Sequence, residues 1–323
     1  MGRVLIRRLL QAVVIIYLVA TVVFILIHLA PGDPFVYLDN PNVTVEVRAQ
    51  RSAALGLDRP LPEQYVRYIG RLATGNLGES IFLNRPVATV MREALPNTIL
   101  LMGTAIILSF GIGVAIGMVQ IARRGSHVER ALTTGSLFFY SMPDFWLALI
   151  VLLVFAYWIP IFPVGGVVDP VMHAYLTPVG RILDRLWHLV LPTVTLTALT
   201  AAGIARYQRS ALLDVVREDF VRTARAKGAT ERTVMTRHAL RNAVLPVITL
   251  LGLSFPALLG GAVFVEKVYS WPGMGLVAVN ALATRDYPLV LGCAITGATM
   301  VSLGNVLADL LYAVADPRLR NDS

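Results

Sequence analysis

The chain has 323 residues, of which 56% are hydrophobic and 15% are charged, with a formal net charge of +8 and a mean hydropathy of +0.68. Soluble globular chains carry about 25% charged residues, so this composition excludes an ordinary soluble domain. The uncharged runs are long and do not alternate with a period of two, which favours membrane-spanning helices over a β-barrel. A single cysteine, Cys293, excludes an intrachain disulfide and a cysteine-based metal cluster.

The first apolar run follows the basic N-terminal sequence MGRVLIRRLL. It is longer than the apolar core of a signal peptide, and the sequence IHLAPGDP that follows offers no small-residue cleavage site. We therefore interpret it as an uncleaved first span. Arg3, Arg7 and Arg8 predict a cytoplasmic N-terminus, because positive residues concentrate on the cytoplasmic side of membrane spans.

Six spans are predicted in total, each long enough for the roughly 20 residues that cross the hydrocarbon core. They cover residues 9–30, 98–122, 131–159, 186–205, 243–265 and 290–314. With six spans, both termini and every arginine-rich loop lie on the cytoplasmic side. The predicted fold class is all-α, a multi-pass membrane protein, and its positive charge follows from this topology without any nucleic acid partner.

Residues 31–97 form the predicted extracytoplasmic segment between the first two spans. The segment is too long for a tight turn, so we expect a small folded cap. At its end, apolar residues recur at helical spacing: Val87, Val90, Met91, Ala94 and Leu95. This spacing predicts a short amphipathic helix at the membrane interface ahead of the second span.

Two residue types predict how the spans are shaped. Gly113 and Gly117 in the second span predict close packing of helices, since small residues allow backbones to approach. Prolines are predicted to kink or end helices at four positions. These are Pro143, Pro192, Pro246 and Pro256.

Catalytic motifs are absent from the sequence. It has no GxxxxGK[ST] phosphate-binding loop, no HExxH and no GxSxG. The five histidines are scattered, with no i, i+4 pair, so a metal site within one helix is not expected. We therefore expect no catalytic, cofactor or metal site in this chain. It is not expected to be an enzyme, which leaves transport or channel function.

The largest charged segment is EDFVRTARAKGATERTVMTRHALRN, residues 218–242. Within it, RTARAKGATERTVMTRHALRNAVLP resembles the cytoplasmic EAA loop of ATP-binding-cassette importer permeases. More narrowly, the chain resembles the first permease subunit of the dipeptide, oligopeptide and nickel group. Arg222 and Thr223 replace the usual Glu-Ala pair, a departure that fits this group.

Seven further motifs of the same group follow one another in the expected order along nearly the whole chain. They are LAPGDP at 29–34, GNLGES at 75–80, SMPDFWLALIVLLVFA at 141–156, FPVGG at 162–166, WPGMG at 271–275, RDYPLV at 285–290 and LLYAVADPRLR at 310–320.

The resemblance implies a type I ABC importer permease fold in the cytoplasmic (inner) membrane. It implies a first helix with an extracytoplasmic segment at 1–97, a five-helix permease core at 98–316 with a cytoplasmic coupling loop at 206–242, and a cytoplasmic tail at 317–323. It also implies several partners: a second homologous permease subunit in a heterodimer, two cytoplasmic ABC ATPase subunits that hydrolyse ATP, an extracytoplasmic substrate-binding protein, and membrane lipid.

The coupling site follows from the same resemblance. It implies a short helix, or the turn that ends it, which seats in a groove of the ATPase. The residues implied are Ala224, Arg225, Ala226, Lys227 and Gly228. A glycine at a helix C-terminus adopts positive φ without strain. Thr230 and Thr233 are candidate caps for the helix that follows.

Asp144 is the candidate residue of the translocation path. It lies near the middle of the predicted third span, where an ionisable residue is costly and usually faces a cavity or a partner. Two interpretations stay open. Asp144 lines the path and favours a cationic group such as a peptide ammonium, or it forms an ion pair or caps the helix that restarts after Pro143.

Three functions are compatible with these observations. The leading hypothesis is a permease subunit for ATP-driven import of peptides. The second is import of nickel or a nickel chelate by the same family, against which the sparse histidines and single cysteine argue weakly. The third is an ATP-independent channel or secondary transporter, which would need no ATPase partner.

Overall fold

The computed structural model describes residues 2–29, 58–260 and 262–315. Within them the chain is helical apart from loops, turns and one isolated β-bridge, between Glu79 and Pro86. The helices are α1 (Gly2–Leu29), α3 (Leu61–Ala73), α4 (Val87–Ala122), α5 (His127–Tyr140), α6 (Asp144–Leu152), η2 (Leu153–Trp158), η3 (His173–Tyr175), α7 (Pro178–Val215), α8 (Asp219–Ala226), α9 (Glu231–Thr233), η4 (Val234–Ala239), α10 (Leu240–Ala243), α11 (Leu245–Gly260), α12 (Val263–Val268), α13 (Met274–Ala283) and α14 (Tyr287–Ala315).

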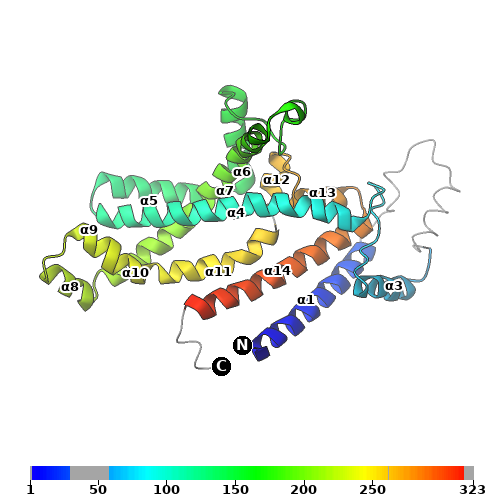
Figure 1. The fold of residues 1–323 in the computed structure, drawn as a ribbon, viewed down its shortest axis with the longest axis horizontal. Coiled ribbons are helices and arrows are strands. Elements are labelled where there is room, and N and C mark those ends of the chain that lie inside the picture. Colours follow the sequence, from blue (N-terminus) through cyan, green and yellow to red (C-terminus); the bar gives the residue numbers. More distant parts are fainter. Residues whose placement is uncertain (1, 30–57, 261, 316–323) are drawn as a thin grey trace.

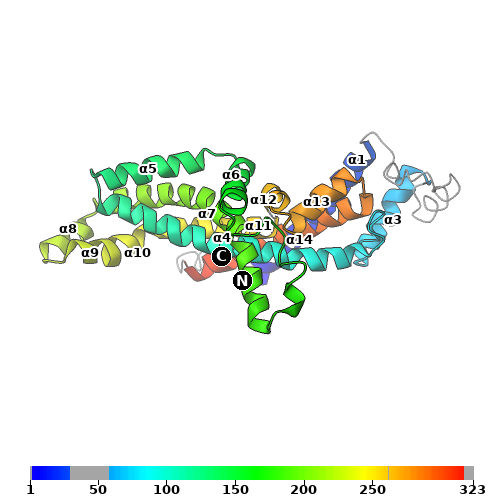
Figure 2. The ribbon, with the colours of Figure 1, turned by 90° about the horizontal axis from the view of Figure 1, so that it is seen from above.

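The long helices are arranged side by side, with short helices at both ends. Helix α4 packs against α7, and α14 packs against α11 and α1. Figure 1 shows α8, α9 and α10 together at one end of this arrangement and α3 and α13 at the opposite end, and Figure 2 shows the same separation from above. The molecule is therefore elongated, with two distinct ends.

Four helices of the described chain are long and apolar enough to cross a membrane. Their apolar stretches are Arg7–Leu29, Val87–Ala122, Pro178–Val215 and Tyr287–Val306. A fifth span results if the bent pair His127–Tyr140 and Asp144–Trp158 counts as one. The predicted helical, multi-pass class agrees with this arrangement. The predicted number of six is not confirmed, since α11, with 16 residues, is shorter than the roughly 20 that cross the hydrocarbon core.

The third span, predicted over 131–159, is divided at Pro143, which confirms the prediction that this proline kinks or ends a helix. Helix α5 ends at Tyr140, and α6 leaves it at an angle of 106°. The cause is local. Pro143 has φ −63° and ψ 137°, an extended conformation, and a proline also disfavours helical geometry in the residue before it. Figure 1 shows α6 rising away from the layer formed by α4 and α5.

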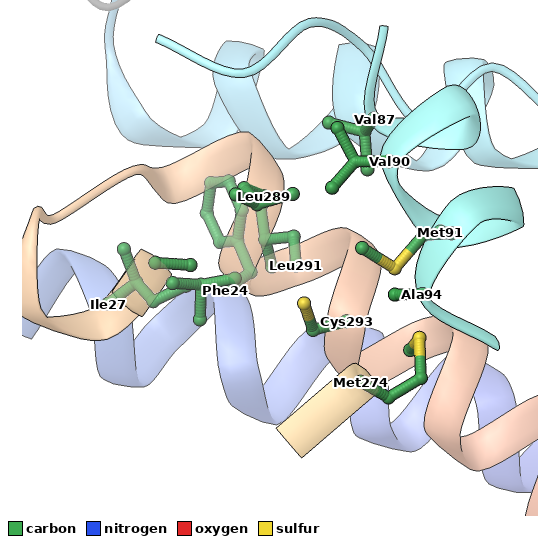
Figure 3. Packing of buried hydrophobic residues seen from close by; sticks show 12 residues of the cluster. Phe24, Ile27, Val87, Val90, Met91, Ala94, Met274, Leu289, Leu291 and Cys293 are labelled. Carbon is green, nitrogen blue, oxygen red and sulfur yellow. The ribbon is translucent and has the colours of Figure 1, made fainter. Parts of the chain in front are cut away.

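The second span begins earlier than predicted. The separate interfacial helix at 87–95 is wrong, because α4 runs without interruption from Val87 to Ala122 and contains Pro96. The apolar face of its first turns does not lie on a membrane surface but packs on α1 and α14. Figure 3 shows these side chains, which meet Phe24 of α1 and Leu289 of α14 in one buried cluster.

The close packing predicted for the glycines of the second span is confirmed. A Cβ atom on Gly113 would lie 2.7 Å from the side chain of Ile204, and one on Gly117 would lie 2.8 Å from that of Gln208. Both partners belong to α7. The backbones of α4 and α7 therefore approach more closely than side chains at these positions would allow.

The remaining spans differ from their predicted bounds in ways that prolines explain. Helix α7 starts at Pro178, where Thr177 accepts a hydrogen bond from the backbone of Gly180, and continues through Pro192. The predicted span 243–265 is divided between α10, α11 and α12, with Pro246 in the first turn of α11. Proline is tolerated in a first turn, because its missing N–H would have no partner there. The predicted tail 317–323 lies outside the described residues.

Candidate functional site

The residues between α7 and α11 form a helical hairpin, made of α8, α9, η4 and α10 and called here the coupling hairpin (residues 219–243). Its first helix ends in a Schellman motif. The N–H of Gly228 donates to the carbonyl of Arg225 at 2.9 Å, and the N–H of Ala229 donates to that of Ala224 at 3.2 Å. Gly228 has φ +81°. The positive φ predicted for Gly228 is therefore confirmed, and it reverses the chain after α8.

The second arm of the hairpin starts with the cap predicted from the sequence. The hydroxyl of Thr230 accepts a hydrogen bond from the backbone N–H of Thr233 at 3.3 Å, and the two hydroxyls lie 2.9 Å apart. A side-chain oxygen at this position satisfies an N–H group that has no partner within the helix. The turn between the arms is thus fixed at both sides.

Only part of the predicted coupling segment is available to a partner. Ala224 is buried against Val221 and Val234, which hold the two arms together. Arg225, Ala226, Lys227 and Gly228 are exposed. The structure therefore presents the end of α8 and its turn as one outward surface, with Ala224 supporting it from behind.

Arg225 has a partner within the hairpin. Its guanidinium donates to both carboxylate oxygens of Glu231, at 2.8 and 3.1 Å. A paired guanidinium of this kind fixes geometry as well as charge. Arg225 holds the pKa of Glu231 below its ordinary value. The exposed surface at 225–228 therefore carries one cation neutralised from its own chain and one, on Lys227, that has no ion pair among the described residues.

The coupling hairpin is joined to the long helices by a buried apolar cluster. The cluster contains Ile121 of α4, Leu212 of α7 and three hairpin residues. The hairpin members are Met235, Ala239 and Ala243. A second tie lies close by, where Arg209 of α7 donates to Glu129 of α5 at 2.6 Å. The hairpin therefore packs directly on α4 and α7, and α7 is in turn paired with α5.

The structure places Asp144 at the bend in the third span, as the first residue of α6. Its carboxylate accepts a hydrogen bond from the N–H of Phe145 at 2.9 Å, and the residue is half-buried. No ion pair to Asp144 occurs among the described residues. A negative charge at a helix N-terminus is stabilised by the helix dipole. The cap and the path interpretations are both compatible with this position.

A buried carboxylate at the end opposite the hairpin was missed by the sequence prediction. Glu266 of α12 is fully buried. It accepts hydrogen bonds from the hydroxyl of Thr98 at 3.0 Å and from the N–H of Leu276 at 2.9 Å. A Cβ atom on either Gly273 or Gly275 would come within 2.9 Å of this carboxylate. Both glycines belong to the WPGMG motif, so the motif makes room for Glu266.

Two aromatic residues extend this buried network. Burial raises the pKa of Tyr269 to about 12, and its hydroxyl lies 2.9 Å from that of Thr195 and donates to the carbonyl of Ala148 at 3.1 Å. The indole of Trp271 donates to the carbonyl of Asn97 at 3.0 Å. A Cβ on Gly165 of the FPVGG motif would lie 2.4 Å from the carbonyl oxygen of Tyr269. Several motifs noted in the sequence are therefore one packed structure.

The GNLGES and RDYPLV motifs meet in the same way. Ser80 donates a hydrogen bond to the carboxylate of Asp286, which also accepts one from the backbone N–H of Phe82 at 3.0 Å. Asp286 in turn accepts from the N–H of Leu289 in the first turn of α14. Among the residues that the structure describes, no group of three or more His, Cys, Asp or Glu side chains is placed to hold a metal.

Comparison with known protein families gives two matches. Residues 107–321 match the family described as "Binding-protein-dependent transport system inner membrane component". Residues 1–102 match its N-terminal companion, "Binding-prot-dependent transport system membrane comp, N-term". Together they cover almost the whole chain and confirm the resemblance indicated by the motifs.

Individual relatives are similar over nearly their full length. The chain is 38% identical over 320 residues to the oligopeptide transport system permease protein AppB of Bacillus subtilis (strain 168), covering 99% of both chains. It is 40% identical over 316 residues to the di/tripeptide transport system permease protein DppB of Pseudomonas aeruginosa (strain UCBPP-PA14), covering 94% of both.

The fold is also found in a solved structure. An inward-facing structure of the MetNI methionine ABC transporter contains a chain that matches with a TM-score of 0.53 at 17% identity. The match covers 71% of this chain and 97% of that one. At this identity the likeness shows the fold alone, that of an importer permease.

Proposed function

The chain belongs to the family of binding-protein-dependent transport system inner membrane components, and we propose that it is a permease subunit that forms half of the translocation pathway of an ATP-driven peptide importer. The observation that carries the proposal is the coupling hairpin. It is a capped turn with an exposed surface, and a buried cluster joins it to two long helices, α4 and α7. A chain without a phosphate-binding loop needs such a surface to receive work from a separate ATPase.

The substrate class rests on the relatives. Both permeases compared above are named for oligopeptides or di- and tripeptides, and they are similar from end to end. Nickel import by the same family gains no support from them. An ATP-independent channel or secondary transporter would have no use for the coupling hairpin, and transport that persists without ATP hydrolysis would favour that alternative.

The proposed assembly contains a second homologous permease subunit, two cytoplasmic ABC ATPase subunits that hydrolyse the ATP, and an extracytoplasmic substrate-binding protein. This chain itself binds no cofactor in the proposal. Arg225, Ala226, Lys227 and Gly228 contact the ATPase, and Ala224 supports them from within the hairpin. The division into residues 1–97, the core 98–316 and the tail 317–323 remains a prediction.

Replacing Gly228 with valine tests the coupling surface. Valine at φ +81° is strained by roughly 1–2 kcal/mol, and its branched side chain would stand on the exposed turn. We expect the permease to insert normally, while co-purification of the ATPases and binding-protein-stimulated ATP hydrolysis both fall. The measurements are subunit stoichiometry and ATPase rate in reconstituted membranes.

Gly125 provides the matched control. It lies in the turn between α4 and α5 with φ +80°, and nothing lies within 4 Å of a Cβ built on it. Gly125→Val therefore introduces the same backbone strain outside the coupling hairpin. Normal ATPase stimulation in Gly228→Val, or an equal loss in both variants, would reduce the hairpin to a positively charged connecting loop.

We also propose six spans with both termini in the cytoplasm, so that α3 lies outside and the coupling hairpin lies inside. Ala73→Cys, at the exposed end of α3, should react with a membrane-impermeant maleimide in intact spheroplasts. Ala226→Cys, exposed in the hairpin, should react only after lysis. Cys293 is buried and should contribute little background. The reverse pattern of labelling would invert the proposed topology.

Asp144 is proposed to line the translocation path at the bend between α5 and α6. Irregular backbone within a membrane is tolerated where it is buried in protein or lines an aqueous cavity. Asp144→Asn keeps the hydrogen bond to Phe145 but removes the charge. Peptide uptake should fall while assembly is preserved, and unchanged uptake would assign Asp144 to the helix cap alone.

A further inference from the structure

We propose that a cavity between α1, α3 and α14 binds the headgroup of a glycerophospholipid, with the lipid phosphate on Arg67 and Arg71. The cavity has a volume of about 110 Å³ and lies at the end of the molecule opposite the coupling hairpin. Its walls come from α1, α3, residues 76–81 and the start of α14. It shares no residue with the coupling surface or with the bend at Asp144.

The cavity is lined by residues of two chemical kinds. Some are apolar and include Phe24 of α1, Ile81 and Leu291 of α14. The others carry hydrogen-bonding and charged groups. These are His28, Gln64, Arg67, Tyr68, Arg71, Asn76 and Glu79. A ligand that fills this space must have a charged part next to an apolar part, as a phospholipid does where its headgroup joins its acyl chains.

The charged residues fit a phosphodiester. Arg67 and Arg71 are four residues apart on α3, so they project from the same face of the helix. Arg67 lies 3.1 Å from Glu63, whereas Arg71 has no ion pair among the described residues. Guanidinium groups bind phosphate through paired hydrogen bonds, which makes arginine the preferred residue for such a group.

Glu79 distinguishes a lipid headgroup from free phosphate. Glu79 lines the same cavity, and a negative charge there disfavours an inorganic phosphate ion. A phosphoethanolamine headgroup instead offers an ammonium to Glu79 and its phosphodiester to the arginines. The arrangement of charges therefore favours phosphatidylethanolamine over an ion from solution.

Tyr68 supplies a donor for which the described part of the chain offers no acceptor. Its ring stacks on Phe24 at a centroid distance of 5.5 Å. Its hydroxyl is buried and makes no hydrogen bond to any described residue. Burial raises the pKa of Tyr68 above its ordinary value, so the hydroxyl stays protonated. Buried polar groups normally have a hydrogen-bond partner, and a lipid oxygen in the cavity would provide one.

The surface next to the cavity can accommodate acyl chains. Only 17% of the apolar stretch of α1 is buried within the chain. Below the cavity α1 exposes Leu18, Val22, Ile25 and Leu26. A lipid whose headgroup occupies the cavity can therefore place its chains along α1, within the hydrocarbon layer.

The test measures lipid retained by the assembled importer in nanodiscs that contain equal amounts of phosphatidylethanolamine and phosphatidylcholine. Native mass spectrometry should find one tightly retained phosphatidylethanolamine per copy of this chain. The double variant Arg67→Gln, Arg71→Gln should lower its occupancy about tenfold, as expected when a charged hydrogen-bonding site is lost. The control, Arg59→Gln with Arg85→Gln, removes the same charge from residues outside the cavity and should retain the lipid.

A second variant and a melting-temperature measurement complete the test. Tyr68→Phe preserves the stacked ring and should lower retention about threefold, which decides the question if the double variant fails to assemble. In lipid-depleted detergent, phosphatidylethanolamine should raise the melting temperature, whereas inorganic phosphate should not. Equal retention in all variants, an equal loss in the control, or stabilisation by inorganic phosphate alone would overturn the proposal.

Discussion

The α12–α13 region (residues 263–283) and the coupling hairpin (residues 219–243) are both short helices joined by glycine-containing turns, yet they are stabilised in opposite ways. The first is tied to distant parts of the chain through Glu266, Tyr269 and Trp271, all of them buried. The hydrogen bonds of the hairpin join near neighbours, such as Thr230 with Thr233, and its long-range contacts are apolar. Segments without long-range buried hydrogen bonds open locally at lower free energy. The comparison therefore predicts that the hairpin opens more readily than the α12–α13 region.

The largest difference between the two regions is expected when Glu266 is replaced. Glu266→Ala leaves the hydroxyl of Thr98 and the N–H of Leu276 without their acceptor, at roughly 1–3 kcal/mol for each buried group. We expect a large fall in the yield of folded protein and in its thermal stability, measured by size-exclusion chromatography with a melting curve. Glu266→Gln keeps one acceptor oxygen in the same volume and should be clearly milder. Equal, small effects of both variants would show that this region is not held by the carboxylate.

A smaller and local effect is expected at Thr230. Thr230→Ala removes the cap of α9 and should destabilise the helix by about 1 kcal/mol. Hydrogen exchange should accelerate in the coupling hairpin and remain unchanged in the α12–α13 region. Thr236→Ala, which removes only a hydrogen bond to the carbonyl of Arg232 within the same arm, is the control. Acceleration in both regions would contradict the independence of the two ends.

The smallest effect is expected at the Arg225–Glu231 pair. Exposed ion pairs contribute about 0.2–1 kcal/mol, so Glu231→Gln should change hairpin stability only slightly. Because Arg225 lowers the pKa of Glu231, the contribution of the pair is present above the ordinary value of 4.5 and is lost as pH falls through the lowered pKa. The contribution of the pair should therefore stay constant between pH 6 and 8, and hydrogen-exchange protection of the hairpin should not change with pH on its account. A change in that range would mean that another group controls the hairpin.

Features set by neighbours in the sequence were predictable. Gly228 with positive φ, the Thr230 cap and the close approach at Gly113 and Gly117 follow from rules for one turn or one helix face. The importer permease fold was predicted by a different route, from the resemblance of the motifs to a known family. The fold and the location of the coupling turn were thus accessible from the sequence.

Features set by distant residues were not predictable. Thr98 and Glu266 are 168 positions apart, so no local pattern indicates that they meet. The apolar face at 87–94 had the period of an interfacial helix, because periodicity gives the face but not what covers it. Helix α4 continues through Pro96, whereas the chain breaks at Pro143. Tertiary packing decides between these outcomes.

The length of α7 has a mechanical consequence. Its 38 residues form one helix of about 57 Å, and it is clamped to α4 where Gly113 and Gly117 meet it. Such a pair behaves as a lever arm, with the coupling hairpin at one end. A tilt of about 5° about Ile204 would move the far end of α7, about 39 Å away, by about 3.4 Å, against about 1.4 Å at the end next to the hairpin. A small movement of the coupling hairpin, driven by the ATPase, would thus produce a larger movement at the opposite end of α7.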